Sequence, residues 1–344
     1  MADIDASAPA ETGGGTGQLS PVARALLSNE FGLIVLVLVF AWIFTGISPA
    51  FMSKFSVYAL GRTAAIDIMI GFSMMVVIIT GGLNLSVGAI GVCAAMTAGW
   101  LMQAFGLPWI PAIFGGIAMG AALGAVNGLL IVRTGLHSFI ITLATMSIFY
   151  GVMIFLTQAE SFREIDAAFA GFGRLKLAEG YLSPLLVVSV VVAVLLVALF
   201  RFTALGREML AAGANPRAAE LSGIRVDRMI AYCHVLSGAL AAVAGVMLVA
   251  RNGAAIPSMA GDVGQNWLLP AFLGPVLGGT LLTGGRISVL GTLLGALLVT
   301  LLNSGLLLMQ VGAFWIQTYL GLLLLAAVLM DMARRRYLAR RKLV

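Results

Sequence analysis

Long apolar runs alternate with short polar or glycine-rich breaks over nearly the whole chain. Each run approaches the roughly 20 residues that a helix needs to cross a bilayer. Charged residues, glycine and proline fill the breaks, as is typical of turns between helices. The pattern predicts ten membrane-spanning helices, at residues 31–51, 58–80, 84–105, 108–132, 138–157, 183–203, 227–250, 267–283, 287–310 and 314–332.

Composition places the chain in the same class. Of the 344 residues, 61% are hydrophobic and only 10% are charged, and the mean hydropathy is +1.07. A soluble domain is far less apolar. The two cysteines, Cys93 and Cys233, lie inside apolar runs, where neither a disulfide nor a metal site is indicated. We expect an all-α polytopic membrane protein without a metal site.

The two ends of the chain differ from the apolar middle. Residues 1–30 are mostly small and polar, with acidic residues where a secretory signal carries positive charge, so they predict a disordered cytoplasmic tail. Residues 31–332 form the predicted transmembrane domain. Residues 333–344 are a basic cytoplasmic tail. Because this tail directly follows an apolar run, its charges are expected to lie against anionic lipid headgroups and not against nucleic acid.

Basic residues predict the orientation. Ten crossings place both termini on one side, and fourteen of the twenty lysines and arginines fall on that side, against six on the other. The positive-inside rule therefore places both termini in the cytoplasm.

Glycines recur at four-residue spacing within 108–132, in the segment GGIAMGAALGAVNG. This spacing puts the small residues on one face of a helix, where another backbone can approach closely. The segment predicts a packing seam. Its four glycines are Gly116, Gly120, Gly124 and Gly128.

The longest predicted cytoplasmic connection, residues 204–226, contains a short helix signature. Asn215 suits an N-cap, Pro216 the first helical position and Gly223 a left-handed helix end, which predicts a helix over 216–222. Seven residues are too few to be helical alone in water, so the segment must dock on something. Ala218 and Leu221 lie on one face of it. A simple connector is the alternative.

Polar residues within or beside the spans are the candidates for a solute path. Neutral hydroxyl and amide groups would suit a hydroxyl-rich solute, and an intramembrane carboxylate is costly unless it is paired, hydrated or protonated. Hydrogen bonding between helices is the alternative for each residue. The candidates are Asp67, Asn84, Ser86, Ser138, Thr142, Thr145 and Asn303.

Several motifs in order along the chain carry a family resemblance. GGLNLSVG at 81–88, FIITLAT at 139–145, the stretch 203–251 and GGTLLTGGRISVLGTLLGALLVTLLNSGLLLM at 278–309 together cover most of the membrane portion. The chain resembles permease subunits of ribose-type (simple sugar) importers of the ATP-binding-cassette class, within the branched-chain amino acid/ribose permease superfamily.

The resemblance implies how such a chain works. The short helix would fit a separate ATPase and transmit its movement, through Gly213, Asn215, Pro216, Arg217, Ala218, Ala219, Glu220, Leu221, Ser222 and Gly223. The implied partners are a second permease copy or paralogue, two cytoplasmic ATP-binding subunits and a periplasmic solute-binding protein, at a bacterial inner membrane. The implied solute is a sugar or a similar hydroxylated molecule, and the chain needs no cofactor of its own.

Some positions depart from the family pattern. Asn84 replaces the usual Asp, Ser138 the usual Pro, and Glu220 stands where many relatives have Arg. Leu268 and Pro270 stand where many members have acidic residues. These departures leave the solute open.

Two other functional classes are alternatives to the importer. An ion-gradient-driven secondary transporter has one feature in its favour, the intramembrane Asp67. An intramembrane enzyme lacks any H-E-x-x-H or G-x-S-x-G motif. No G-x-x-x-x-G-K-[ST] precedes a lysine, so an ATP-driven transporter would need its ATPase on another chain.

Overall fold

Helices make up nearly all of the structure. The computed structural model describes residues 29–310, 315, 317–326 and 329. Within them, eight helices are long and apolar enough to cross a membrane, which confirms an all-α polytopic protein. They are α2 (Asn29–Ile47), α3 (Lys54–Ile78), α4 (Val87–Phe105), α5 (Trp109–Thr134), α6 (Ser138–Thr157), α8 (Pro184–Phe202), α11 (Val226–Asn252) and α13 (Val289–Leu308).

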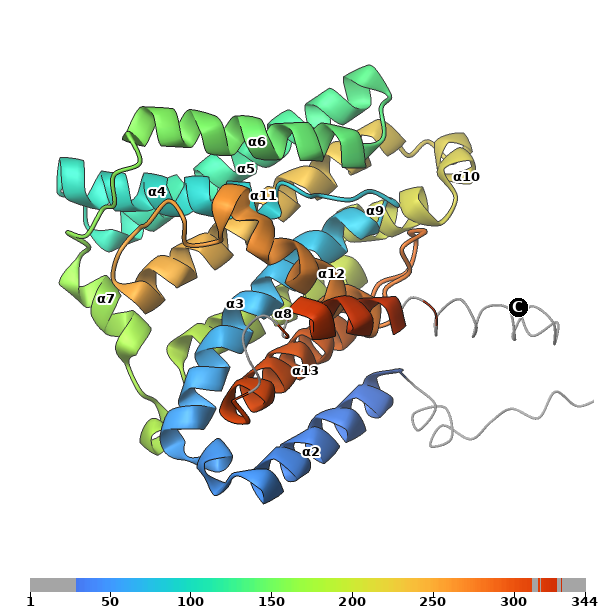
Figure 1. Ribbon diagram of the computed structural model, residues 1–344. Helices are drawn as coiled ribbons and strands as arrows, with labels where there is room; N and C mark the ends of the chain where they lie inside the picture. The colour runs from blue at the N-terminus through green and yellow to red at the C-terminus, as the bar shows by residue number, and fades with distance from the viewer. Residues whose placement is uncertain (1–28, 311–314, 316, 327–328, 330–344) are drawn as a thin grey trace, which may run out of the picture.

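The long helices pack side by side, with α11 and α3 at the centre (Figure 1). On one side, α5 and α4 cover α11, and α6 lies outside them. On the other side, α13 covers α3, and α2 lies outside α13. Most residues of α3, α4 and α11 are buried, whereas α2 is mainly exposed. The central helices therefore form a core, and the outer ones present apolar side chains to lipid.

The glycines of α5 form a packing seam, as predicted, and the structure shows that the seam faces mainly α11. A Cβ at Gly120 would overlap Gly238, and one at Gly124 would overlap the backbone of His234. Gly116 approaches the carbonyl of Ala94 in α4 just as closely. Small residues at these positions let the helix backbones come together, which is how membrane helices gain packing energy.

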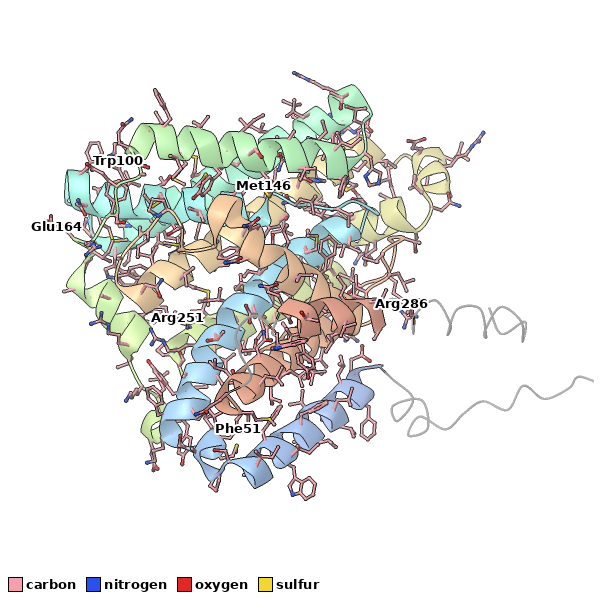
Figure 2. The ribbon with its side chains drawn as sticks, viewed as in Figure 1. Phe51, Trp100, Met146, Glu164, Arg251 and Arg286 are labelled. Atoms are coloured by element: carbon pink, nitrogen blue, oxygen red, sulfur yellow. The ribbon has the colours of Figure 1, made fainter. Side chains whose placement is uncertain are left out.

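Short helices identify the two ends of the bundle. We call one the α10 end, because it carries α9 (Ala204–Ala214) and α10 (Pro216–Leu221). The opposite one is the α7 end, which carries α7 (Ala167–Arg174). Figure 2 shows Glu164 at the α7 end and Arg286 near the α10 end. The 3-10 helices η1 (Pro49–Met52) and η2 (Ala178–Gly180) lie in connections at the α7 end.

The interval 267–283 does not form the full helical span that its hydropathy predicts. Helix α12 covers only Leu268–Leu277, ten residues or roughly 15 Å, about half of a bilayer core. After α11 ends at Gly253, residues 253–261 are irregular and η3 (Asp262–Trp267) leads into α12. Trp267 packs where a Cβ of Gly91 would lie, beside the carbonyl of Ala241, near the middle of α11. The chain therefore enters the bundle as a loop and leaves it as a half-length helix.

A second irregular segment, residues 79–86, connects α3 to α4. It starts at the α10 end and runs inward, so that α4 begins three residues later than its predicted span. The elements that follow the two irregular segments, the start of α4 and η3, meet inside the bundle, because a Cβ on Gly88 would overlap the carbonyl of Gly264. Irregular backbone at membrane depth is tolerated only where protein buries it or where it lines a water-filled cavity.

The outermost elements close one side of the bundle. Ser288, the N-cap of α13, donates a hydrogen bond of 2.8 Å to Glu30 of α2. The described part of the tenth predicted span includes the apolar helix Gln317–Ala326, whose Leu320 packs with Leu273 and Val299. The predicted N-terminal tail, apart from residues 29 and 30, and the basic tail at 333–344 lie outside the described residues.

Candidate functional site

A chain of buried side-chain hydrogen bonds surrounds the start of α4. Asn84 Oδ1 accepts from the Ser86 hydroxyl (2.7 Å) and from Ser86 N (3.1 Å), while Asn84 Nδ2 donates to Ser237 of α11 (3.0 Å). Asn127 of α5 donates to Ser86 Oγ (2.8 Å) and accepts from Thr145 of α6 (2.7 Å). All five residues are buried. We call them the Asn84 network.

Two further hydroxyls of α6 hold the backbone of residues 79–86. The amide of Leu83 donates to Ser138 Oγ at 2.8 Å, and the amide of Leu85 donates to Thr142 Oγ1 at 3.1 Å. These bonds satisfy amides that an unwound segment would otherwise leave unpaired in a dry interior. Ser138 thus has a structural use.

The Asn84 network ties three helices, α5, α6 and α11, to one irregular segment. Its polar atoms bond to one another and are sealed from solvent, so this arrangement favours interhelical bonding over direct contact with a solute. Five of the seven candidate path residues belong to it or to the adjoining α6 hydroxyls: Asn84, Ser86, Ser138, Thr142 and Thr145.

The other two candidates, Asp67 and Asn303, are half-buried and lie elsewhere. Thr300 of α13 donates to Asp67 Oδ2 at 2.7 Å, and Asn303 follows Thr300 by about one turn. Arg251, at the α7 end of α11 (Figure 2), interacts electrostatically with Asp67. Its carbonyl accepts from Arg62 Nη2 at 2.7 Å. Half-exposed charges within membrane spans need water or another protein surface beside them.

Helix α10 forms as the sequence predicts. Asn215 Oδ1 caps it by accepting from Ala218 N at 3.1 Å, and Gly223 has a φ of +85°, although the helix ends at Leu221, one residue before the expected end. Figure 1 shows α10 protruding beside α9. The Leu221 side chain is 86% exposed and Ala218 is exposed too, while Ala219 is buried against the chain's own residues.

The base of α9 joins this protrusion to the interior. A Cβ on Gly213 would overlap the carbonyl oxygen of Ile79, the first residue after α3. The same oxygen accepts a 2.8 Å hydrogen bond from Gly285 N, in the connection before α13. Gly213 therefore belongs to an internal joint, which we call the Ile79 joint, and not to an exposed docking face.

Sequence reasoning missed three bonding partners and the short helices α7 and α9. The missed partners are Asn127 and Ser237 in the Asn84 network and Thr300 beside Asp67. Each is a polar residue inside an apolar run, and the sequence carries no other signal for it. Helix α7 was missed because it is short. Its cap Asp166 and the aromatic residue Phe169, which stacks on Trp109 at 5.9 Å, were available as signals.

Comparison with known proteins identifies the family. The family described as "Branched-chain amino acid transport system / permease component" matches residues 56–332, most of the chain. The chain belongs to this permease family. The permease is therefore a non-catalytic membrane subunit of an importer, as the resemblance implied.

Several curated relatives are import permeases along nearly their whole length. The ribose import permease protein of Bacillus subtilis is 38% identical over 89% of this chain and 92% of its own. The D-allose transport system permease protein of Escherichia coli is 33% identical over 90% and 94%. The fructose import permease protein of Rhizobium meliloti is 33% identical over 93% and 90%. No solved structure matches the permease.

Proposed function

We propose that the permease carries a sugar or a similar hydroxylated small molecule across a bacterial inner membrane. The three relatives described above carry ribose, allose and fructose by name, and each aligns over most of its length. Two copies, or one copy with a close relative, would form the path. A periplasmic binding protein would deliver the solute, and two cytoplasmic subunits would bind and hydrolyse ATP.

The observation that carries ATPase coupling is the exposed leucine of α10. Leu221 is 86% exposed on a six-residue helix that buries only Ala219 against its own chain. An isolated helix of this length is unstable in water, and an exposed apolar side chain at its tip is suited to a partner's pocket. A hollow of about 380 Å³ beside it, lined partly by Glu208, Arg228 and Tyr232, offers space for partner side chains.

The path is best supported beside Asp67. This carboxylate, Arg62 and Arg251 are half-buried at membrane depth, whereas the Asn84 network is sealed. Charges at this depth are expected to face water or an adjoining protein chain. We therefore place the path of the assembled importer along the face where α3, α11 and α13 meet.

A substitution in α10 tests the coupling. Leu221→Asp puts a charge into an interface that should exclude water, and losing a central apolar contact typically costs about 2 kcal/mol or more. That cost corresponds to a roughly 30-fold weaker association. We expect the variant to reach the membrane, but to lose the ATPase subunits on purification and to lose uptake of labelled ribose.

Leu136→Asp is the matched control, because Leu136 is an exposed leucine in the turn between α5 and α6 at the same end of the bundle. It should leave ATPase binding nearly unchanged. Normal ATPase binding by Leu221→Asp would show that α10 is only a connector. Ribose uptake that survives loss of the ATPase, but stops with an uncoupler, would favour the ion-gradient alternative.

The orientation has its own test. The α10 end carries most of the basic connections, which supports a cytoplasmic location for it and for both termini. Reporters fused after Arg228 and after Val344 should report cytoplasm, and one at Ala168 should report periplasm. A periplasmic result at Arg228 would overturn the orientation and the docking proposal together.

A further inference from the structure

A second polar region at membrane depth lies beside the start of α12. A hollow of about 310 Å³ opens between η3, α12 and the helix Gln317–Ala326. Its size is at the lower end of the range for small-molecule sites, which suits a small solute. The lining residues are Gln265, Asn266, Leu269, Pro270, Gln317 and Leu320.

The polar side chains of this hollow lie at membrane depth, where leaving them without hydrogen-bond partners costs free energy. A Cβ on Gly91 would meet both the ring of Trp267, which is next to Asn266, and the carbonyl of Ala241, close to the middle of α11. The side chains of Gln265, Asn266 and Gln317 are nevertheless exposed. Lipid tails offer no partner for such groups, so they need water, protein or a solute.

The chemistry of the lining is selective. A carboxamide both donates and accepts hydrogen bonds, which matches a hydroxyl group, itself a donor and an acceptor. Leu269, Pro270 and Leu320 add apolar surface against which the C–H face of a sugar ring can pack. The described lining contains no acidic or basic side chain. The lining therefore favours a neutral polyhydroxylated solute over an ion or an amino acid.

From this geometry we infer that Gln265, Asn266 and Gln317 form a solute-binding station beside α12, a helix that packs on both α3 and α13 of the proposed path face, and that the station takes a neutral monosaccharide-sized polyol or sugar. This inference rests on the proposed transport function and specifies where the solute pauses. Gln265 and Asn266 are positioned by η3, which the glycine contact between Gly264 and Gly88 holds against α4, and Gln317 is positioned by the helix Gln317–Ala326.

Cysteine accessibility provides a direct test in the assembled importer. The native Cys93 and Cys233 are 7% and 0% exposed, so background labelling should be low. We expect Gln317→Cys to react with a charged, water-soluble methanethiosulfonate reagent. A sugar at ten times its Kd leaves about one site in eleven free, so the reaction should slow about tenfold. The probes are D-ribose, D-allose and D-fructose, each tested alone.

Two control variants give the expected labelling of a water-exposed site and of a lipid-covered site. Leu221→Cys, on exposed α10, is tested in the permease without its ATPase and should react at one rate with or without sugar. Trp42→Cys, 78% exposed on the outer face of α2, should not react because lipid covers it. Absence of labelling at Gln317→Cys, or labelling that none of the three sugars slows, would overturn the station.

Uptake separates failure of the station from failure of the proposed function. Gln265→Leu keeps the side-chain size but removes the amide, and should reduce sugar uptake while the ATPase subunits still co-purify. Asn252→Ala, which removes an exposed amide at the α7 end of α11, should leave uptake near normal. Normal uptake by Gln265→Leu would count against the station. If the unaltered importer transports none of the three sugars, the proposed solute class fails instead.

Discussion

Two irregular segments interrupt the permease at membrane depth, and they solve the same backbone problem differently. Residues 79–86 follow α3, and their freed amides are taken up by Ser138 and Thr142. Residues 253–267 follow α11 and expose Gln265 and Asn266 to a hollow. Non-helical backbone needs either protein partners or a wet cavity at this depth, and the permease uses both solutions.

The difference teaches which segment can interact with solute. In the first, Asn84, Ser86 and their partners use their hydrogen-bonding atoms on one another, so a solute would have to break existing bonds. In the second, the exposed amides stand free to exchange partners as a solute passes. Residues 79–86 together with the Asn84 network therefore have a structural role, and we call them the frame. Residues 253–267 can interact with solute, and we call them the working surface.

The largest expected effect comes from breaking the frame. Asn84→Leu removes the acceptor of both the Ser86 amide and the Ser86 hydroxyl, and each buried donor left unsatisfied costs about 1–3 kcal/mol. We expect little folded permease in the membrane and a lowered melting temperature in detergent.

Asn84→Asp is the matched variant, because a protonated aspartic acid keeps the oxygen that accepts both bonds and its hydroxyl can donate to Ser237 as the amide does. It should accumulate far better than Asn84→Leu. If the two variants accumulated equally, the hydrogen bonds of the Asn84 network would not be what holds the frame.

Much of this architecture follows from sequence, for identifiable reasons. Apolar length and polar punctuation predict the eight long helices, and the four-residue glycine spacing of α5 predicts its contact with α11. The cap at Asn215 and the left-handed Gly223 predict α10 nearly to the residue. Each of these features is encoded locally, within one or two helical turns.

The irregular segments could not be predicted from such local patterns. Residues 267–283 are as apolar as a membrane span, and the packing of Trp267 where a Cβ of Gly91 would lie joins parts of the chain that are distant in sequence. Likewise Asn84 and Ser86 have the pattern of path residues, because their respective partners Ser237 and Asn127 lie far away in sequence. Hydropathy reports that a segment is apolar, but not whether its backbone is helical at every depth.

The next largest effect concerns the contact that joins the two segments. Gly88→Ala would place a methyl group against the Gly264 carbonyl, and overpacking of this kind typically costs about 1–3 kcal/mol. We expect lower thermal stability in detergent. Gly151→Ala in α6, where a Cβ meets nothing within 4 Å, should be neutral or slightly stabilising. Equal melting temperatures for the two variants would contradict close packing at Gly88.

A smaller and more specific effect is expected at the Ile79 joint, which connects the frame to α10. Gly213→Ala would push α9 away from the Ile79 carbonyl without touching the exposed Leu221. The ATPase should still co-purify, but solute transported per ATP should fall, by about fivefold for a loss of about 1 kcal/mol of coupling. Arg207→Ala, an exposed change on the same helix, is the control. Unchanged coupling in Gly213→Ala would exclude the joint from transmission.

The smallest expected effect is at Asp67, and it sharpens the contrast between frame and working surface. Asp67→Asn keeps an oxygen that accepts from Thr300, so only the charge interaction with Arg251 is lost. Because the side chain is half-buried, we expect that loss to cost no more than about 1 kcal/mol. Ribose uptake should therefore stay within about fivefold of the unaltered importer. Asp67→Leu, which also removes the bond to Thr300, should reduce uptake further.

Measuring uptake of both variants across the pH range in which the importer is stable separates the two roles of the carboxylate. A structural Asp67 predicts parallel pH profiles for Asp67→Asn and the unaltered protein. A sharp fall in uptake with loss of its pH dependence, at normal membrane abundance, would instead identify Asp67 as a proton carrier and favour the ion-gradient mechanism.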